Sequence, residues 1–303
     1  MTVCRDLPYV VAKLDWMRAQ RIWPNGLRYL WTDAFGVILL ASLHVATGKR
    51  EYLDAAEWVV AQVDRVLGRA HGIRIGEASD RHGQYFHYLA MWLYALSILG
   101  RHLPDYRGKG VELVRQVHDA FVVPHRGVYW KMLEDLSGPD PEYGFGALDA
   151  FDGYVSYRLL DEEALTREIG EMRALIDRAA PGLDVTQDLG IGMMLWLTHF
   201  FPDERWAAEQ KSRCLATLDR MWVEDGYFCR APGHYDVRFA FTNYGVSIGL
   251  QAVAAMSQRV GRLNAYFETY RSGDNYDREA ITHVMACSSH FPGYLMADFG
   301  PSN

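Results

Sequence analysis

Two kinds of helical segment alternate along the chain, and they differ in where their polar residues fall. One kind opens with a small polar cluster and continues almost without charge, as in WTDAFGVILLASLHVATG from Trp31 and RHGQYFHYLAMWLYALSILG from Arg81. The other carries apolar residues on one stripe and charged residues on the other, as in EYLDAAEWVVAQVDRVLG from Glu51. A surface helix spreads its polar residues along one face. The first kind is therefore predicted to form inner helices and the second outer helices.

The inner-type segment recurs, with further copies from Ala147, Thr186 and Phe241 and a weaker one from Ile281. The polar residues that open these segments are spaced about 40 to 65 residues apart, the length of a two-helix unit with its loops. We refer to them as the polar anchors, and they are Asp33, Gln84, Asp149, Asp188, Asn243 and His283. If the segment from about Leu7 to Gln20 serves as the last outer helix, the pattern predicts six hairpins and twelve helices.

A hairpin of this kind cannot bury its inner helix alone, whereas a closed ring of hairpins can. We therefore expect an all-α fold, an (α/α)6 toroid of inner and outer helices, as a single domain over residues 1–303. Short β segments are expected only in loops, at Gly127 and Gly226. The long loops precede inner helices, over residues 69–83, 121–146 and 223–240. Loops, polar anchors and the positive ends of the inner-helix dipoles are thus predicted to meet around one shared cavity.

Composition narrows the function classes. Of the 303 residues, 50% are hydrophobic and 23% charged, and the net charge is -7 without a long run of Lys or Arg, so the electrostatic footprint of a nucleic-acid binder is missing. The N-terminus lacks a signal-peptide pattern and the longest apolar run, residues 35–46, is too short to span a bilayer. We expect a cytoplasmic protein without a membrane partner. The four cysteines form no CxxC pair and no HExxH motif occurs, so we expect no metal or other cofactor.

The candidate catalytic groups are aspartates at inner-helix starts. Asp149 and Asp152 are three residues apart in LDAFDG and share one helix face. Two close carboxylates raise the pKa of one of them, which suits a general acid, so Asp149 is the expected proton donor. Asp33 or Asp188 is expected to act as the partner base or charge stabiliser. Their alternative role is structural, because an acid is favoured at a helix N-terminus as a cap.

Other polar and aromatic side chains gather where the cavity is predicted. A His or Arg in such a loop can orient a substrate carboxylate or transfer a proton, and aromatic faces can stack on a sugar ring. We expect the partner to be a small molecule. Its expected contacts are Trp31, Gln84, Tyr85, His87, Trp130, Asp152, His234, Arg238, Asn243 and Tyr244.

The inner-helix starts Trp-Thr-Asp, Gly-Gln-Tyr, Leu-Asp-Ala-Phe-Asp-Gly and Thr-Asn-Tyr-Gly, with long aromatic loops before them, resemble the six-hairpin glycosidase superfamily of (α/α)6 barrels. That group includes unsaturated glucuronyl hydrolases and related sugar epimerases, and the resemblance covers most of the chain as architecture. It implies a carbohydrate-active enzyme. The hydrolases use Asp or Glu as acid and base and the epimerases use a pair of histidines; the chain offers both kinds of residue.

From these residues we expect a glycoside hydrolase that uses aspartates as acid and base. One alternative is a cyclase or isomerase that starts by protonating an apolar, terpene-like substrate in the same aromatic-lined cavity; such an enzyme needs no DDxxD motif, and the chain has none. A second alternative is a barrel that binds a ligand without turning it over, because fold does not determine function.

Overall fold

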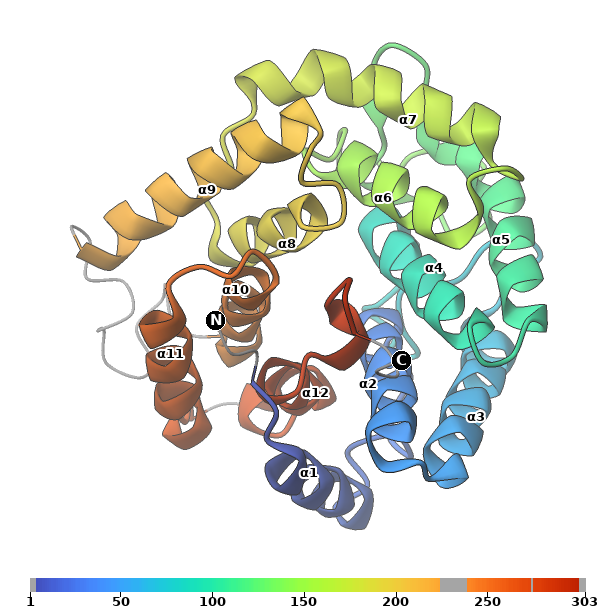
Figure 1. Ribbon diagram of the computed structural model, residues 1–303. Helices are drawn as coiled ribbons and strands as arrows, with labels where there is room; N and C mark the ends of the chain where they lie inside the picture. The colour runs from blue at the N-terminus through green and yellow to red at the C-terminus, as the bar shows by residue number, and fades with distance from the viewer. Residues whose placement is uncertain (1–3, 224–238, 274, 300–303) are drawn as a thin grey trace. The chain divides into compact units, whose positions relative to one another are not determined.

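The computed structural model describes residues 4–223, 239–273 and 275–299 (Figure 1). In this part of the chain there are twelve α-helices and four short strands. Their contacts divide the chain into two compact units. The central unit is Leu27–Pro181, and the terminal unit combines Met1–Gly26 with Gly182–Asn303.

The central unit consists of three helical hairpins, each with an inner and an outer helix. The inner helices α2, α4 and α6 pack against one another in that order (Figure 1). Most residues of α2 and α4 are buried, whereas the outer helices bury one face only, which confirms the predicted division. The hairpins are α2 (Leu30–Thr47) with α3 (Arg50–Leu67), α4 (Phe86–Gly100) with α5 (Asp105–Phe121), and α6 (Asp149–Asp161) with α7 (Thr166–Ala179).

The terminal unit repeats this plan. Its inner helices are α8, α10 and α12, and the N-terminal helix packs on α12 as the last outer helix, as predicted. Short 3-10 helices of this unit cover Asn275–Asp277 and Gly293–Leu295, and a third, Ala180–Gly182, lies where the chain passes from the central to the terminal unit. The hairpins are α8 (Asp188–Thr198) with α9 (Arg205–Val223), α10 (Ala240–Ala252) with α11 (Ser257–Thr269), and α12 (Ala280–His290) with α1 (Leu7–Ala19).

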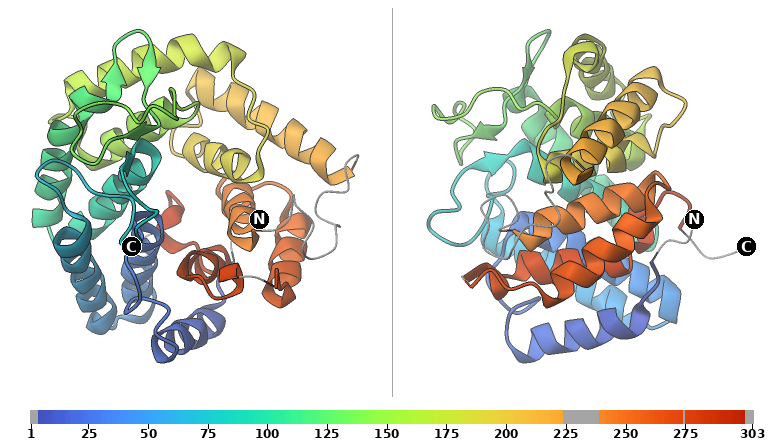
Figure 2. Two further views of the ribbon diagram at one scale, coloured as in Figure 1. Left: turned by 180° about the vertical axis from the view of Figure 1, so that it is seen from behind. Right: turned by 90° about the vertical axis from the view of Figure 1, so that its left-hand side faces the viewer.

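The strands lie in the loops of the central unit (Figure 2). β1 (Gln84–Tyr85) pairs antiparallel with β4 (Lys131–Met132), and β2 (Val122–Val123) pairs with β3 (Gly127–Val128). The β segment predicted at Gly127 is confirmed, and the one predicted at Gly226 lies outside the described residues. Because Tyr85 lies opposite Lys131, the β1–β4 pair ties the loop before α4 to the loop before α6.

Helix α2 is long and apolar enough to cross a membrane, by length and composition only. The apolar run of residues 35–46, judged too short to span a bilayer, is only part of this helix, which extends over Leu30–Thr47. In the structure 78% of the 18-residue window is buried inside the protein, as is typical of a core helix.

Helices α8 and α10 cross with their backbones in near contact. A Cβ atom on Gly192 would lie 2.4 Å from the Gly245 carbonyl oxygen, and one on Gly249 would lie 2.2 Å from the Gly192 carbonyl oxygen. We expect Gly192→Ala to lower the free energy of unfolding by about 1–3 kcal/mol, because the two backbones must separate. Chemical denaturation measures this change.

The matched control is Gly261→Ala on α11, where an added Cβ would meet nothing within 4 Å. That variant is expected to gain stability, by up to about 1 kcal/mol, from helix propensity alone. Equal stability of the two variants would contradict the close crossing of α8 and α10.

Candidate active site

The N-terminal ends of α2, α4 and α6 bring together four side chains that the sequence analysis picked out. The Nδ1 atom of His87 lies 2.7 Å from Oδ2 of Asp152. The Trp31 ring stacks on the His87 ring, with centroids 4.5 Å apart and planes 29° apart. Asp149 opens α6 one turn before Asp152, and the charges of Asp152 and His87 both act on it. We refer to Trp31, His87, Asp149 and Asp152 as the acid–histidine cluster.

His87 has the arrangement of a general base. Its Nδ1 donates to the Asp152 carboxylate, so the neutral ring presents the lone pair of Nε2. Among the residues of the structure that are described, none forms a hydrogen bond with Nε2, and the side chain is 18% exposed. Burial lowers the pKa of His87, but the charge of Asp152, its hydrogen bond and the charge of Asp149 outweigh burial and raise the pKa above its ordinary value.

Asp149 has the arrangement of a general acid. It is 3% exposed, and its Oδ1 atom has no hydrogen-bond partner within the described part of the chain. Burial, followed by the charge of Asp152, raises the pKa of Asp149 well above its ordinary value, against the opposing effect of His87. The loop backbone closes over this carboxyl group, since a Cβ atom on Gly146 would lie 1.6 Å from Oδ2 of Asp149. The neutral, protonated form of Asp149 is therefore favoured.

An aromatic group adjoins α4 on the β1–β4 pair. Tyr85 and Trp130 stack with ring centroids 5.5 Å apart and planes 10° apart, and Tyr143 meets Trp130 edge-on at 5.0 Å. The Lys131 ammonium lies over the rings of Tyr85 and Tyr143 and pairs with Asp140 at 3.0 Å. Trp130 is 42% exposed, so part of its surface is open to a ligand.

Asp33 is held in a buried ion pair. Its Oδ1 accepts from Nη1 of Arg28 at 2.8 Å and its Oδ2 accepts from the backbone N–H of Tyr29 at 3.2 Å. Asp33 is fully buried and Arg28 is 3% exposed. Both carboxylate oxygens of Asp33 are thus occupied at the start of α2, which agrees with a structural role at the helix N-terminus. Arg28 was not picked out from the sequence.

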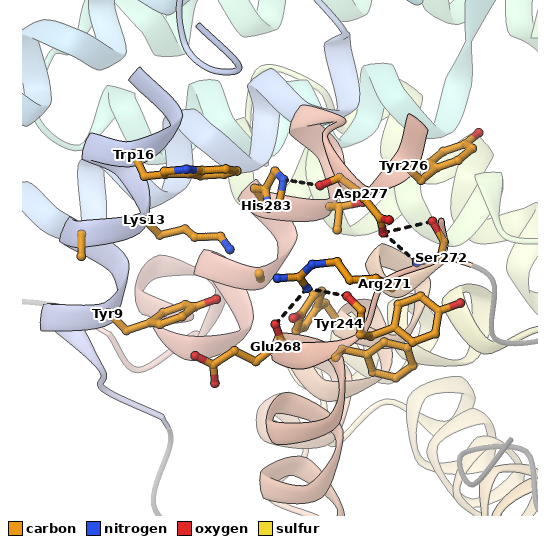
Figure 3. A pocket seen from close by; sticks show the side chains of 16 residues that line it. Tyr9, Lys13, Trp16, Tyr244, Glu268, Arg271, Ser272, Tyr276, Asp277 and His283 are labelled. Carbon is orange, nitrogen blue, oxygen red and sulfur yellow. Dashed lines mark hydrogen bonds between the residues drawn. The ribbon is translucent and has the colours of Figure 1, made fainter. Parts of the chain in front are cut away.

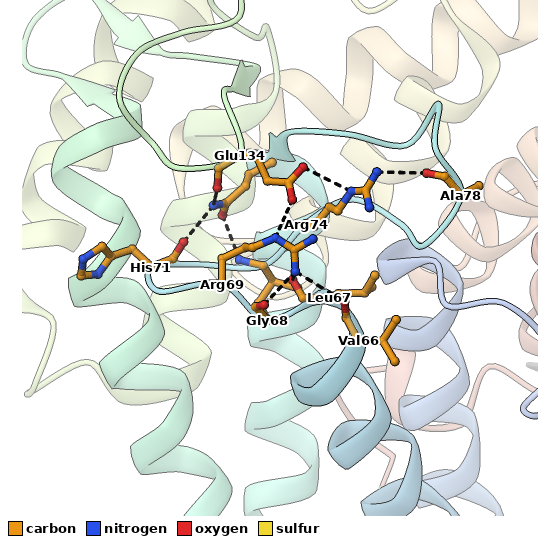
Figure 4. A network of polar contacts seen from close by, with 10 residues as sticks. Val66, Leu67, Gly68, Arg69, His71, Arg74, Ala78 and Glu134 are labelled. Atoms are coloured by element: carbon orange, nitrogen blue, oxygen red, sulfur yellow. Dashed lines mark hydrogen bonds and ion pairs between the residues drawn. The ribbon is translucent and has the colours of Figure 1, made fainter.

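Gln84 joins the two long loops of the central unit, next to the ion pairs of Glu134 with Arg69 and Arg74 (Figure 4). Its Oε1 accepts from the backbone N–H of Ile73 at 2.9 Å, and its Nε2 donates to the carbonyls of His71 and Glu134, each at 2.9 Å. The Glu134 carboxylate is itself held by two arginines. Because Gln84 is fully buried and both its N–H groups serve the backbone, it holds the loops together, and we leave it out of the proposed substrate contacts.

Trp31 was expected to stack on a sugar ring, but like Gln84 it is buried. It is 1% exposed, and its ring packs against Phe35, His87 and Tyr88. Its neighbours therefore cover the faces that a sugar would need, and Trp31 instead supports one face of the His87 ring.

Tyr88 and its hydrogen-bonding partners were missed in the sequence analysis. The Tyr88 hydroxyl bonds to the Tyr29 hydroxyl, which also accepts from Nη1 of Arg81 at 3.1 Å. Burial is the main cause that raises the pKa of Tyr88 well above its ordinary value, so the phenol keeps its proton. The one signal in the sequence was its position directly after His87, within a helix that otherwise looks apolar.

Three expected site residues lie in the terminal unit. Asp188 accepts from the Thr242 hydroxyl at 2.5 Å and from the backbone N–H of Leu189 at 2.7 Å. Asn243 is fully buried, and its Nδ2 donates to the Phe239 carbonyl at 3.2 Å. Tyr244 is 2% exposed and lines a pocket of this unit.

Other site expectations remain open. The candidates His234 and Arg238 lie outside the described residues. Within residues 4–223, 239–273 and 275–299, no three His, Cys, Asp or Glu side chains are grouped as a metal site requires. That the candidates of both units line one shared cavity stays a prediction.

Comparisons with known proteins identify structural relatives. No protein-family model matches the chain, and no curated protein matches its sequence. Cellobiose 2-epimerase from Spirochaeta thermophila matches with a TM-score of 0.64 and 14% identity, over 88% of this chain and 86% of its own. Cellobiose 2-epimerase from Bacillus thermoamylovorans has a TM-score of 0.59 and 9% identity, over 87% of each chain. A D-mannose isomerase has a TM-score of 0.64 and 11% identity, over 94% of this chain and 97% of its own.

Likeness at this level of identity shows the fold. The matched structures are (α/α)6 barrels, so the all-α (α/α)6 fold predicted from the sequence is confirmed. The (α/α)6 architecture that the resemblance implied is therefore observed, and the matches extend over both units of the chain.

Proposed function

We propose that the protein is a sugar epimerase or isomerase that moves a proton next to a carbonyl group, with His87 as the general base. The observation that carries this proposal is the His87–Asp152 pair, which leaves the Nε2 lone pair of His87 without a hydrogen bond from any described residue. The names of the matched structures, cellobiose 2-epimerase and D-mannose isomerase, support it.

The chemistry follows from the positions of the protons. In an open-chain sugar, the hydrogen on carbon 2 is acidic because the carbonyl group at carbon 1 stabilises the resulting anion. Nε2 of His87 accepts this hydrogen as a proton, and the imidazolium that forms is stabilised by Asp152. Asp149 donates its proton to the carbonyl oxygen, which gives a neutral enediol. Return of a proton to carbon 1, with loss of the proton on oxygen 2, gives the ketose. Return of a proton to the other face of carbon 2, with the proton on oxygen 1 going back to the Asp149 carboxylate, gives the epimer.

Trp130 and Tyr85 are the proposed ring contacts. Their stacked pair carries the exposed aromatic surface beside α4, and the apolar face of a sugar packs well on such a surface. We propose a small-molecule sugar substrate for this reason and because both kinds of matched enzyme act on sugars by name.

Glycoside hydrolysis with Asp149 as the acid is the second candidate. The buried carboxyl group of Asp149, with its raised pKa, favours it. A hydrolase also needs a second, free carboxylate. Neither expected partner offers one, because Arg28 and the Tyr29 backbone occupy Asp33, and Asp188 accepts from the Thr242 hydroxyl and the Leu189 backbone. Isomerisation needs only the groups that the acid–histidine cluster contains, and epimerisation needs in addition a proton donor on the opposite face of carbon 2.

A deuterium experiment separates the two reactions. The protein is incubated in D2O with a panel of aldoses, ketoses and disaccharides and followed by NMR. We expect conversion to an epimer or ketose with deuterium at carbon 1 or carbon 2, because protonated His87 exchanges its proton with solvent. Release of a sugar from a glycoside without deuterium at these carbons would favour hydrolysis. Turnover of an apolar polyene alone would favour the cyclase.

A further inference from the structure

The terminal unit contains a pocket that the proposed function does not use (Figure 3). Its volume is about 470 Å³, within the range of about 300–1,000 Å³ that is usual for small-molecule sites. Residues of α1, α10, α11 and α12 and of the segment between α11 and α12 form its walls. The pocket is therefore built entirely within one compact unit.

Two cations face one another across this pocket. Figure 3 shows the Lys13 ammonium and the Arg271 guanidinium pointing toward each other. Lys13 lies over the rings of Tyr9 and Trp16, at 5.8 and 5.2 Å from their centroids, and Arg271 donates to backbone carbonyls. Within the described part of the chain, neither cation pairs with a carboxylate. Two like charges held together in this way favour an anion between them.

The electrostatics of Lys13 agree with this arrangement. Burial lowers the pKa of Lys13, and the nearby charge of Arg271 lowers it further, while Glu268 and Cys287 act in the opposite direction. A bound anion would offset the repulsion from Arg271. Arg271 also suits such a ligand, because a guanidinium can donate two parallel hydrogen bonds to a carboxylate or phosphate.

Asp277 and His283, two other titratable residues of the wall, are each engaged in a local hydrogen bond and pair with neither Lys13 nor Arg271. Asp277 accepts from the backbone N–H groups of Ser272 at 2.7 Å and Gly273 at 2.9 Å, so its carboxylate serves its own turn. Nε2 of His283 donates to the Asp277 carbonyl at 3.0 Å. Burial, and then the charge of Lys13, lowers the pKa of His283 to about 4, which leaves this ring neutral at pH 7.

Two wall residues have unmet hydrogen-bonding capacity. The hydroxyls of Tyr9 and Thr282 are buried and have no partner among the described residues. An unpaired buried hydroxyl is costly, and a polar ligand could supply the missing bond after a small adjustment of the side chain. Glu268 is exposed at the same pocket and offers an acceptor for a ligand hydroxyl.

We propose that this pocket binds a small molecule that carries a carboxylate or phosphate group, with the anionic group between Lys13 and Arg271. Trp16 is 40% exposed and offers an aromatic edge to the rest of the ligand. The pocket shares no residue with the acid–histidine cluster. The proposal therefore holds whether or not the protein acts on sugars.

Isothermal titration calorimetry tests it with inorganic phosphate, glucose 6-phosphate, glucuronate and neutral glucose. We expect at least one of the anions to bind, and glucose to bind at least about tenfold more weakly at this site. Lys13→Met and Arg271→Gln are each expected to weaken anion binding by about tenfold or more. The matched control is Lys49→Met, which removes the same charge from an exposed position of the central unit and is expected to leave binding unchanged.

The outcomes identify the source of the anionic group. Binding of glucuronate alone would assign a carboxylate, and binding of phosphate and glucose 6-phosphate would assign a phosphate. Absence of binding by all three anions, or equal binding by wild type, Lys13→Met and Arg271→Gln, would overturn the proposal. His87→Ala separates the two functions, because it is expected to keep anion binding even where sugar turnover is lost.

Discussion

His87→Ala is expected to lower kcat for sugar epimerisation or isomerisation by about 10²–10⁴-fold, the usual contribution of one positioned acid–base group. The reason is geometric: Asp152 holds Nδ1 of His87, and Nε2 is the nitrogen left to accept a proton. Steady-state kinetics on the active sugar measure the change. The matched control is His102→Ala, which lies beyond the opposite end of α4 and is expected to keep kcat within about twofold, well below the contribution of a catalytic base.

The pH profile gives a second measure of His87. A base must be neutral to act, so kcat/KM should rise as pH increases through the pKa of His87, which lies above its ordinary value of about 6.5. Asp152→Asn removes a charge that raises this pKa, so the midpoint of the profile should move to lower pH. Wild-type turnover in His87→Ala, or an unmoved midpoint in Asp152→Asn, would contradict the role of His87 as base.

The fold could be predicted because its helices differ in pattern. An inner helix such as α4 is buried along nearly its whole length, while an outer helix such as α3 buries one stripe, and both patterns are local properties of the sequence. The pairing of α1 with α12 also follows, since a closed repeat needs a last outer helix. The single domain over residues 1–303 stays a prediction.

The positions of the candidate residues could be predicted where they depend on local spacing. Asp149 and Asp152 share a helix start in the structure as in the sequence, and His87 meets Asp152 because α4 and α6 are neighbours. Gln84 shows the limit of this reasoning. A polar residue before an inner helix looks the same in the sequence whether it binds a substrate or, as here, the carbonyl of Glu134, 50 residues away.

Arg28 shows a second limit. Whether an arginine five residues before Asp33 reaches that carboxylate depends on how the intervening loop turns. The same applies to Trp130, which reaches Tyr85 only through the antiparallel pairing of β1 with β4. Non-local pairing of short loop strands has no periodic signal in the sequence, so these contacts had to come from the structure.

Asp149→Asn is expected to lower turnover by about 10²–10⁴-fold and to change how stability depends on pH. The folded-state pKa of Asp149 is raised above the unfolded value of about 3.9. Between these two pKa values the unfolded chain has lost the proton that the folded chain keeps, so the free energy of unfolding of the wild type falls as pH rises. Asparagine does not ionise, so the variant lacks this contribution and should lose less stability between pH 4 and pH 7.

Denaturant unfolding at several pH values measures this difference, and Asp135→Asn provides a control of opposite sign. Hydrogen bonds from Ser137 lower the pKa of Asp135 in the folded protein. The ionised carboxylate therefore stabilises the folded state above the unfolded pKa of about 3.9, and this stabilisation is lost as pH falls below that value. Removing it should lower the free energy of unfolding by a nearly constant amount between pH 4 and pH 7, whereas removing Asp149 should raise it relative to wild type by an amount that grows with pH over this range. If Asp149→Asn keeps wild-type turnover but shows the expected pH dependence, Asp149 is a buried acid without a catalytic role. If the stability of Asp149→Asn falls as steeply as that of the wild type when pH rises from 4 to 7, Asp149 does not hold its proton in the folded protein. The donor to the carbonyl oxygen must then be another group.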